Sequence, residues 1–345
     1  MEEKIKAIID SATRIVIIQA DNPDADSLGS SLALEHILGD MGKQVSLYCG
    51  VDIPGYLRYL QGWDRVAKEL PKQFDASIFV DVSTLTLLEK LQSSGELSWL
   101  KAKPSIVLDH HGSVDNQVDF AAMHIDDHAS AAAELVYSLA KKLSWPISSA
   151  AGTNIMTGIL GDTQGLSNDL TSAETYRVMA ELVELGANRP ELEEQRREFG
   201  KMPAEIYQYK AKLIERTEFA AGGRIAYVGI PQQEITDFSP LYNPGPLVQG
   251  DMLGVTGVGL AIVFKQYDDG KITAAIRANN SYSIADKLAD HFGGGGHPYA
   301  SGFKLTNGRP LNEVKSECIE FATDLLNNLD KERTHEAIQY TDAPR

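Results

Sequence analysis

The stretch Ser105-Ile106-Val107-Leu108-Asp109-His110-His111 is a hydrophobic run that ends directly in three polar residues. Other apolar segments in the same half of the chain also end in acidic residues, at Asp24 and Asp26, at Asp81 and at Asp162. Open α/β sheets bind ligands at the carboxyl ends of their parallel strands, and carboxylates and imidazoles gathered there are suited to divalent metals. The sequence therefore predicts an α/β fold with a metal centre, as in a two-metal hydrolase.

The composition is that of a globular protein with more than one domain. The chain has 345 residues, of which 43% are hydrophobic and 23% charged. This length predicts two domains, and this composition argues against disorder. No apolar run approaches the roughly 20 residues of a membrane helix, and the first residues contain no secretory core, so we expect a cytoplasmic protein without a membrane partner. Cys49 and Cys318 are expected to be reduced and buried.

The formal net charge of −16 limits the partners of the chain. A protein that follows long nucleic acid needs a basic surface to displace counterions from many phosphates. This surface repels polyanions on average, so we expect no long nucleic acid as a partner. Any polyanion that binds should be short, held where metal ions and a few Arg and His residues reverse the local charge.

The N-terminal part alternates strand and helix patterns. Strands are predicted at residues 14–19, 44–49, 76–81 and 106–109, and helices at 2–11, 27–41, 129–142 and 149–160. Such alternation predicts a doubly wound parallel sheet. We assign residues 1–190 to this domain and residues 191–216 to a helical connector.

The pattern changes after Gly223. A strand is predicted at residues 224–230, a hairpin at 259–267 and 271–278, and a helix at 283–292. We assign residues 217–330 to a smaller α/β domain with a mixed sheet, and 331–345 to a loose polar tail.

Asp24 and Asp26 stand where a helix is predicted to begin. An Asp there is most often an N-cap that binds free amide groups. A second carboxylate one residue away exceeds the needs of capping, so two metal ions are the alternative. Asp81 and Asp162 are weak signals alone, because segments often end in Asp for turn formation.

His110 and His111 are more informative because they close a strand that is predicted to be buried. Neutral imidazole is a ligand for Mn, Zn or Fe, and a neighbouring imidazole can hold a phosphoryl oxygen. The run Gly293-Gly294-Gly295-Gly296-His297 has two interpretations. It is either a flexible helix end or a loop whose amide groups bind an anion, and we favour the anion.

These residues together resemble a known family. Asn22-Pro23-Asp24-Ala25-Asp26, Asp81, Asp109-His110-His111 and Asp162-Thr163 occur in the order of the four motifs of the DHH phosphoesterase superfamily. Arg277 and the segment from Gly293 to Gly302 resemble the substrate-binding DHHA1 domain of its nanoRNase branch. The resemblance implies a Mn²⁺-dependent enzyme that acts on very short RNA oligonucleotides, linear dinucleotides or nucleoside 3′,5′-bisphosphates. The sequence leaves open whether the chain forms a homodimer.

The resemblance also implies roles for the predicted metal ligands. Asp24 and Asp81 would bind the first ion, and Asp26, Asp81, His110 and Asp162 would bind the second, with Asp81 bridging. A water held between the ions would attack phosphorus while the metals neutralise the charge on the phosphoryl oxygens.

Further roles concern the substrate and the orientation of the ligands. His111 and Arg277 would hold the scissile phosphate, and Gly293–Gly296 with His297 would receive another phosphate or the sugar. Asp109 would orient an imidazole. The predicted catalytic group is thus Asp81, Asp109, His110 and His111.

The chain departs from the family pattern at Ala20. The first motif usually carries a histidine there, four residues before its first aspartate. Asp21, Asn22 or water is left as the replacement, and oxygen ligands would make Mg²⁺ acceptable at this first site. A smaller departure is Gln164-Gly165-Leu166, where an aromatic residue is common.

Other functions stay open at this point. Ala20 is compatible with a degenerate member that binds a nucleotide as a sensor without turnover. A cyclic dinucleotide phosphodiesterase is a further alternative. The negative charge argues against a processive single-strand DNA exonuclease, and the glycine run with His297 argues against an inorganic pyrophosphatase.

Overall fold

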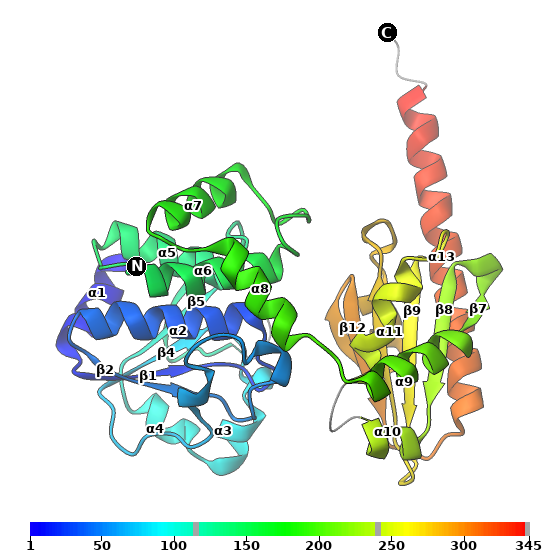
Figure 1. The fold of residues 1–345 in the computed structure, drawn as a ribbon, viewed down its shortest axis with the longest axis horizontal. Coiled ribbons are helices and arrows are strands. Elements are labelled where there is room, and N and C mark those ends of the chain that lie inside the picture. The colour runs from blue at the N-terminus through cyan, green and yellow to red at the C-terminus, as the bar shows by residue number, and fades with distance from the viewer. Residues whose placement is uncertain (113–116, 239–242, 342–345) are drawn as a thin grey trace. The chain divides into compact units, whose positions relative to one another are not determined.

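The computed structural model describes residues 1–112, 117–238 and 243–341. The chain divides into two compact units, Met1–Lys201 and Met202–Arg345, which we call unit 1 and unit 2 (Figure 1). Each unit has its own sheet, with helices on both faces.

Unit 1 contains a parallel sheet of six strands in the order β3-β2-β1-β4-β5-β6. The strands are β1 (Arg14–Ile18), β2 (Gln44–Tyr48), β3 (Val66–Ala67), β4 (Ala76–Val80), β5 (Ser105–Asp109) and β6 (Ala122–Ile125). The chain builds outward from β1 in one direction and from β4 in the other. The doubly wound sheet is therefore confirmed, and its topological switch point lies between β1 and β4, where such sheets bind ligands.

Helices cover both faces of this sheet (Figure 1). Ile15 and Ile17 of β1 pack against the helices of the first face, whereas Val16 and Ile18 pack on the second, as the two-residue period of a strand requires. The first face is covered by α1 (Glu2–Ser11), α2 (Ala25–Asp40), α5 (Ala132–Lys142), α6 (Ser149–Asp162), α7 (Ala173–Glu184) and α8 (Arg189–Phe199). The second face is covered by α3 (Glu89–Ser94) and α4 (Leu97–Lys101).

Helices α2 and α6 approach each other closely because glycines line their contact. A Cβ atom on Gly29 would lie 2.6 Å from the carbonyl oxygen of Asn154. A Cβ atom on Gly158 would lie 2.6 Å from Oδ1 of Asp26 and 2.5 Å from Cβ of Ala133. These three distances are too short for any side chain, so the two glycines determine how near α6 can bring its carboxyl end to Asp26.

Unit 2 contains a mixed sheet in the order β11-β12-β10-β9-β8-β7. Only the β8–β9 pair is parallel among the described strands of this sheet, so the predicted mixed sheet is confirmed. The strands are β7 (Glu218–Ala220), β8 (Ile225–Ile230), β9 (Leu260–Gln266), β10 (Ile272–Ala278), β11 (Gly295–His297) and β12 (Ala300–Leu305). One face carries α9 (Ala204–Glu215), α10 (Gln232–Phe238) and α11 (Pro244–Leu253), and the other carries α12 (Ala285–His291) and α13 (Leu311–Thr341).

Two segments differ from the expected organisation. The connector expected at residues 191–216 is divided, because Leu192 of α8 packs in the core of unit 1 and Ile206 of α9 packs in the core of unit 2. The tail expected to be loose from residue 331 continues α13 to Thr341, and residues 342–345 lie outside the described residues. A helix that already packs Val314 and Leu326 in the core extends readily into a polar end, since elongation costs less than nucleation.

Within the described residues, none of the helices is long and apolar enough to cross a membrane. Cys49 and Cys318 are both buried free thiols, as expected.

Candidate metal centre

The predicted acidic and imidazole ligands of unit 1 lie at the carboxyl edge of its parallel sheet. Asp24 and Asp26 follow β1 at the start of α2, Asp81 directly follows β4, and His110 directly follows β5. Asp162 comes from a helix, since it is the last residue of α6. The centre therefore lies at the switch point between β1 and β4, and the carboxyl end of α6 adds Asp162 to the residues that follow the strands.

His110 lies in the middle of this group. Its Nε2 atom is 3.0 Å from Oδ2 of Asp162, 3.6 Å from Oδ1 of Asp81 and 3.8 Å from Oδ2 of Asp26. Two overlapping sets have ligand atoms within 4.8 Å of one another, Asp26 with His110 and Asp162, and Asp81 with His110 and His111. The structure thus brings together all four residues expected around the second ion.

The ring of His110 is oriented by a backbone carbonyl. Its Nδ1 lies 3.2 Å from the carbonyl oxygen of Ala129, and a proton on Nδ1 donates to that oxygen. This contact turns Nε2 toward the carboxylates. An imidazole held by one nitrogen in this way is the usual arrangement of a metal-binding histidine.

Asp81 has an unusual backbone. Its φ of 56° lies in the left-handed region, which is costly for a residue with a Cβ atom. The conformation is held because the Asp81 N–H donates to the carbonyl oxygen of Leu108 at 2.9 Å. Its Oδ1 atom is buried and makes no hydrogen bond to any residue that the structure describes. A buried carboxylate oxygen without a donor is suited to a cation.

Asp24 and Asp26 both bind helix N-termini, although only one of these was expected. Oδ1 of Asp24 accepts from the backbone N–H groups of Asp26 and Ser27, so the capping interpretation of Asp24 is correct. Asp26 accepts from the N–H groups of Ala132 at 2.6 Å and Ala133 at 2.9 Å, at the start of α5. These amides fix the Asp26 carboxylate within the centre.

Burial and crowding raise the pKa of the carboxyl groups. Burial, followed by repulsion from Asp162, raises the pKa of Asp26 to about 7. Burial and repulsion from Asp26 raise the pKa of Asp81 well above its usual range. Burial lowers the pKa of His110, but Asp162 and Asp26 outweigh it and raise the value to about 9. A cluster that holds protons against this repulsion can exchange them for a divalent cation, so the residues fit a metal.

Asp109 holds His111. Oδ1 of Asp109 accepts from Nδ1 of His111 at 2.7 Å and from the His111 backbone N–H at 3.2 Å. Burial raises the pKa of Asp109, but the bond to His111 outweighs it and lowers the value, and the same bond raises the pKa of His111. The His111 ring is therefore held by Nδ1, and its bond to Asp109 favours the protonated form.

The replacements considered for Ala20 differ in their environment. Ala20 itself is buried and packs among the residues of the second face. Asp21 accepts at Oδ2 from the N–H of Lys90 at 2.9 Å, at the start of α3, and its Oδ1 lies against Gly50 after β2. Asn22 is exposed. Asp21 is thus directed toward β2 and α3 rather than toward Asp81.

The remaining predicted residues belong to unit 2. Arg277 is half-buried in β10, burial lowers its pKa, and its Nη1 donates to the carbonyl oxygen of Ile276. Arg277 pairs with Ala300, which pairs with His297, so the three residues form one row across the sheet. The side chain of His297 lies outside the described residues.

Backbone conformation and close packing account for several glycines of the run Gly293–Gly296, and the sequence did not indicate either. Gly293 has a φ of 71° and ends α12, while Gly294 and Gly296 lie so close to β12 that a Cβ atom would collide with its backbone. Gly295, Gly296 and His297 form β11, where a loop was expected. Whether this segment also binds an anion stays a prediction.

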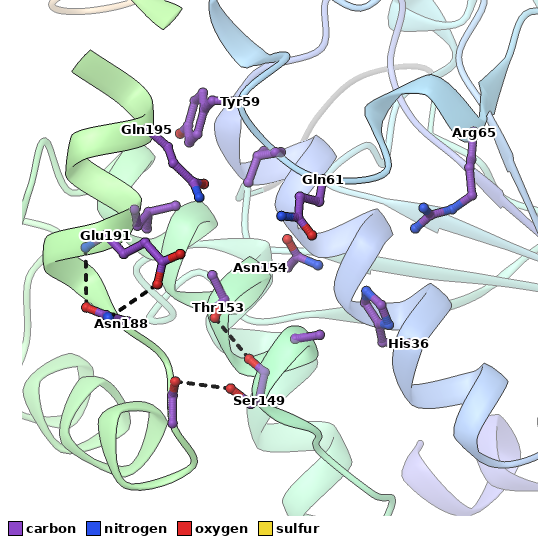
Figure 2. Close-up of a pocket in the computed structure, with 14 residues that line it drawn as sticks. His36, Tyr59, Gln61, Arg65, Ser149, Thr153, Asn154, Asn188, Glu191 and Gln195 are labelled. Carbon is purple, nitrogen blue, oxygen red and sulfur yellow. Dashed lines mark hydrogen bonds between the residues drawn. The ribbon is translucent and has the colours of Figure 1, made fainter. Parts of the chain in front are cut away.

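Two pockets of unit 1 contain none of the predicted ligands. A pocket of about 300 Å³ lies between α2, α6 and α8, and Gln61, Asn154 and Gln195 lie around it (Figure 2). A pocket of about 480 Å³ is lined by Ala25, Tyr56 and Gly161. Ala25 stands between Asp24 and Asp26, and Gly161 precedes Asp162, so this second pocket adjoins the metal centre.

Comparison with known proteins agrees with this arrangement. The model of the DHH family N-terminal domain matches residues 14–159, and the model of the DHHA1 domain matches residues 247–328. The chain belongs to the DHH/DHHA1 superfamily. The DHH match contains four of the five predicted metal ligands, and Asp162 lies three residues beyond it.

Curated relatives assign the chain to the nanoRNase branch of this superfamily. It is 28% identical over 315 residues to the bifunctional oligoribonuclease and PAP phosphatase NrnA of Thermus thermophilus, covering 88% of each chain. It is 23% identical over 320 residues to the protein of the same name from Bacillus subtilis, covering 89% of this chain and 95% of the relative.

Solved structures share the fold. An exopolyphosphatase-related protein from Bacteroides fragilis superposes with a TM-score of 0.82 at 21% identity, covering 94% of this chain and 97% of that chain. RecJ of Thermus thermophilus in complex with Mn²⁺ gives a TM-score of 0.53 at 14% identity, covering 93% of this chain and 54% of that chain. At these identities the likeness concerns the fold alone.

Proposed function

We propose that this protein is a phosphoester hydrolase that acts on very short RNA, linear dinucleotides or nucleoside 3′,5′-bisphosphates with two bound Mn²⁺ ions. The observation that carries the proposal is the convergence of Asp26, Asp81, His110 and Asp162 at the switch point of the sheet. The names of the curated relatives support the substrate class.

Asp26, Asp81, His110 and Asp162 would hold one ion, and Asp24 with Asp81 the other. Bound divalent ions lower the pKa of a water and neutralise charge on phosphoryl oxygens. Mn²⁺ is the proposed metal because the set mixes carboxylates with imidazole, and Mg²⁺ is an acceptable substitute where only oxygens contribute.

His111 would bind the scissile phosphate. Its Nδ1 is held by Asp109, and its raised pKa favours a proton on Nε2. The Nε2–H can donate to a phosphoryl oxygen that gains charge in the reaction. Arg277 and the segment from Gly293 to His297 would bind the rest of the nucleotide. These roles make unit 1 the catalytic part and unit 2 the substrate-binding part.

The pocket next to the metal centre is suited to a base or sugar. Tyr56 is 59% exposed, and Leu57, Tyr59 and Leu160 also line the pocket. An exposed aromatic ring can stack on a nucleobase without preference for its identity. Tyr56→Ala should therefore raise KM for a dinucleotide, whereas Tyr56→Phe should leave KM unchanged because it keeps the aromatic ring.

Substrate turnover tests the proposal directly. The rates of hydrolysis of a linear dinucleotide, a five-nucleotide RNA, a twenty-nucleotide RNA and a nucleoside 3′,5′-bisphosphate would be measured with Mn²⁺, with Mg²⁺ and with EDTA. We expect Mn²⁺-dependent hydrolysis of the short substrates, and a steep fall beyond about five nucleotides because the net charge of −16 repels longer chains.

Two results would contradict the proposal. Equal rates on the two-nucleotide and twenty-nucleotide RNAs would refute the length limit. Nucleotide binding without hydrolysis under any metal would identify a sensor instead.

A further inference from the structure

Gln19 is a polar residue at the centre of the sheet for which neither the motifs nor the fold gives a role. It directly follows β1, and its N–H donates to the carbonyl oxygen of Tyr48 at 3.0 Å, which extends the β1–β2 pairing by one residue. Ile18 is paired with Phe79 of β4, so Gln19 lies beside Val80, the residue before Asp81. Neighbouring strands are about 4.8 Å apart. Gln19 therefore lies at the switch point, beside the residue that precedes Asp81.

The alternation of β1 indicates the face on which the Gln19 side chain lies. Ile15 and Ile17 pack with α2, α5 and α6, whereas Val16, Ile18 and Ala20 pack on the opposite face. Continuing the period of two places Gln19 on the α2 face. Asp26 of α2 and Asp162 of α6 belong to the same layer.

The amide of Gln19 lacks partners within the described part of the chain. Gln19 is 0% exposed, and neither Oε1 nor Nε2 makes a hydrogen bond to the described residues. An apolar side chain would fill this position without leaving two polar atoms unsatisfied, and unsatisfied buried groups oppose folding. A bound ion near the carboxylates would supply the partner that the protein does not provide for this buried amide.

The first metal site is also short of a donor. Ala20 offers no ligand atom, and Asp21 accepts at Oδ2 from the backbone N–H of Lys90, while its Oδ1 lies near Gly50 without a hydrogen-bond partner among the described residues. Asp24 uses Oδ1 to cap α2. Gln19 lies one residue from the missing ligand and beside Val80, the residue before Asp81, which the proposed function assigns to both ions.

We propose that the amide oxygen of Gln19 is an additional ligand of this metal centre, which lacks the imidazole that the family carries at position 20. This inference rests on the proposed function, because it assumes that the centre binds divalent ions. A neutral oxygen in place of nitrogen makes the site harder, so its preference shifts from Mn²⁺ toward Mg²⁺. The Nε2 group remains free to donate to a neighbouring carboxylate.

The test compares metal binding with the stability of the metal-free protein. Gln19→Met keeps the length of the side chain and removes the amide, and Gln19→Glu keeps an oxygen at the same place. Gln249→Met is the matched control, because Gln249 is a buried glutamine of unit 2 whose Nε2 donates to Ala261 and Ala275. Mn²⁺ and Mg²⁺ affinities would be measured by calorimetric titration, and melting temperatures in EDTA.

We expect Gln19→Met to weaken Mn²⁺ binding at one site by about tenfold or more, an effect typical of lost support around a metal. Its melting temperature in EDTA should equal or exceed that of the natural chain, whereas Gln249→Met should melt lower and bind metal normally. Gln19→Glu should retain Mn²⁺ affinity or increase it.

Three results would overturn the inference. Unchanged Mn²⁺ affinity in Gln19→Met would exclude Gln19 as a ligand, and a lower melting temperature with that unchanged affinity would assign it a structural role. Loss of affinity in Gln19→Glu as large as in Gln19→Met would implicate the NH₂ group instead of the oxygen. If the natural chain binds no divalent ion, the proposed function itself fails, and that result is distinguishable because it does not depend on Gln19.

Discussion

The two units present their polar residues in different ways. In unit 1, the described strands of the sheet are parallel, so residues that follow β1, β4 and β5 meet at one edge of the sheet. In unit 2, most pairs are antiparallel, and Arg277 and His297 lie on two strands, β10 and β11, with β12 between them. A parallel sheet concentrates charge at one edge, whereas an antiparallel sheet spreads side chains over a face.

The difference predicts separate roles, because crowded carboxylates need a cation and a spread surface suits an extended substrate. In unit 1, burial together with repulsion from Asp162 raises the pKa of Asp26 to about 7. In unit 2, the half-buried Arg277 offers positive charge, and burial lowers its pKa. The following predictions test this contrast.

Removing the carboxylate of Asp81 should have the largest effect. Asp81→Asn should lower kcat/KM by roughly 10³-fold or more and reduce the bound metal, because the proposed mechanism gives Asp81 both ions. Asn tolerates the left-handed backbone at this position better than Ala, so the fold should persist. Hydrolysis rates and metal content by elemental analysis would measure both effects.

Asp75→Asn is the matched control for this change. Asp75 precedes β4 at the opposite end of the same strand and pairs with Arg14 at 2.9 Å. Its loss should leave metal content and turnover unchanged. Full activity in Asp81→Asn would refute the mechanism.

Substitutions in unit 2 should weaken catalysis without releasing metal. Arg277→Lys and His297→Ala should each lower kcat/KM ten- to a thousandfold, about 1.4 to 4 kcal/mol, since lysine cannot copy a bidentate phosphate contact. Arg224→Lys serves as a control, because Arg224 pairs with Asp330. Unchanged kinetics in both variants, or a parallel loss of metal, would show that the units do not divide the roles in this way.

Metal should stabilise unit 1 and leave unit 2 unchanged. Ions that bind only the folded state add about 2.7 kcal/mol at a hundredfold excess over Kd, and here they also relieve the repulsion among Asp26, Asp81 and Asp162. Hydrogen exchange with Mn²⁺ and with EDTA would resolve the two units. We expect Mn²⁺ to slow exchange in α2, α5 and α6 of unit 1. If Mn²⁺ slowed exchange in unit 2 by the same amount, the metal would not bind unit 1 alone.

The smallest expected effect concerns the contact between α2 and α6. Gly158→Ala should cost about 1 to 3 kcal/mol, because its Cβ atom would lie 2.6 Å from Oδ1 of Asp26, and it should also displace that metal ligand. Gly39→Ala, at the other end of α2, has nothing within 4 Å and should instead stabilise by about 0.5 to 1 kcal/mol. Denaturant unfolding measures the free energy of unfolding of both variants. Equal changes in Gly158→Ala and Gly39→Ala would show that the close contact between α2 and α6 does not require a glycine.

Much of the fold could be predicted from the sequence. The alternation of apolar strands and amphipathic helices determined the parallel sheet of unit 1, because hydrophobic period and chain connectivity leave few topologies. The positions of Asp81 and His110 at strand ends also followed from the sequence, since parallel strands end at the same edge. The division of residues 191–216 between the units did not follow, because helical periodicity does not indicate which core a helix joins.

Other features were decided only by the tertiary structure. The amides of Ala132 and Ala133 reach Asp26 across more than a hundred residues, and Gly158 makes room for that carboxylate. Gly294 and Gly296 lie closely against β12, whereas the sequence favoured an anion-binding loop for this glycine run. Gln19 gave no signal in the sequence of an apolar strand. It became a candidate ligand only because it is buried without a hydrogen-bond partner among the described residues and lies beside the residue before Asp81. Local pattern determines which residues can reach the centre, but the distances between side chains depend on how distant segments pack.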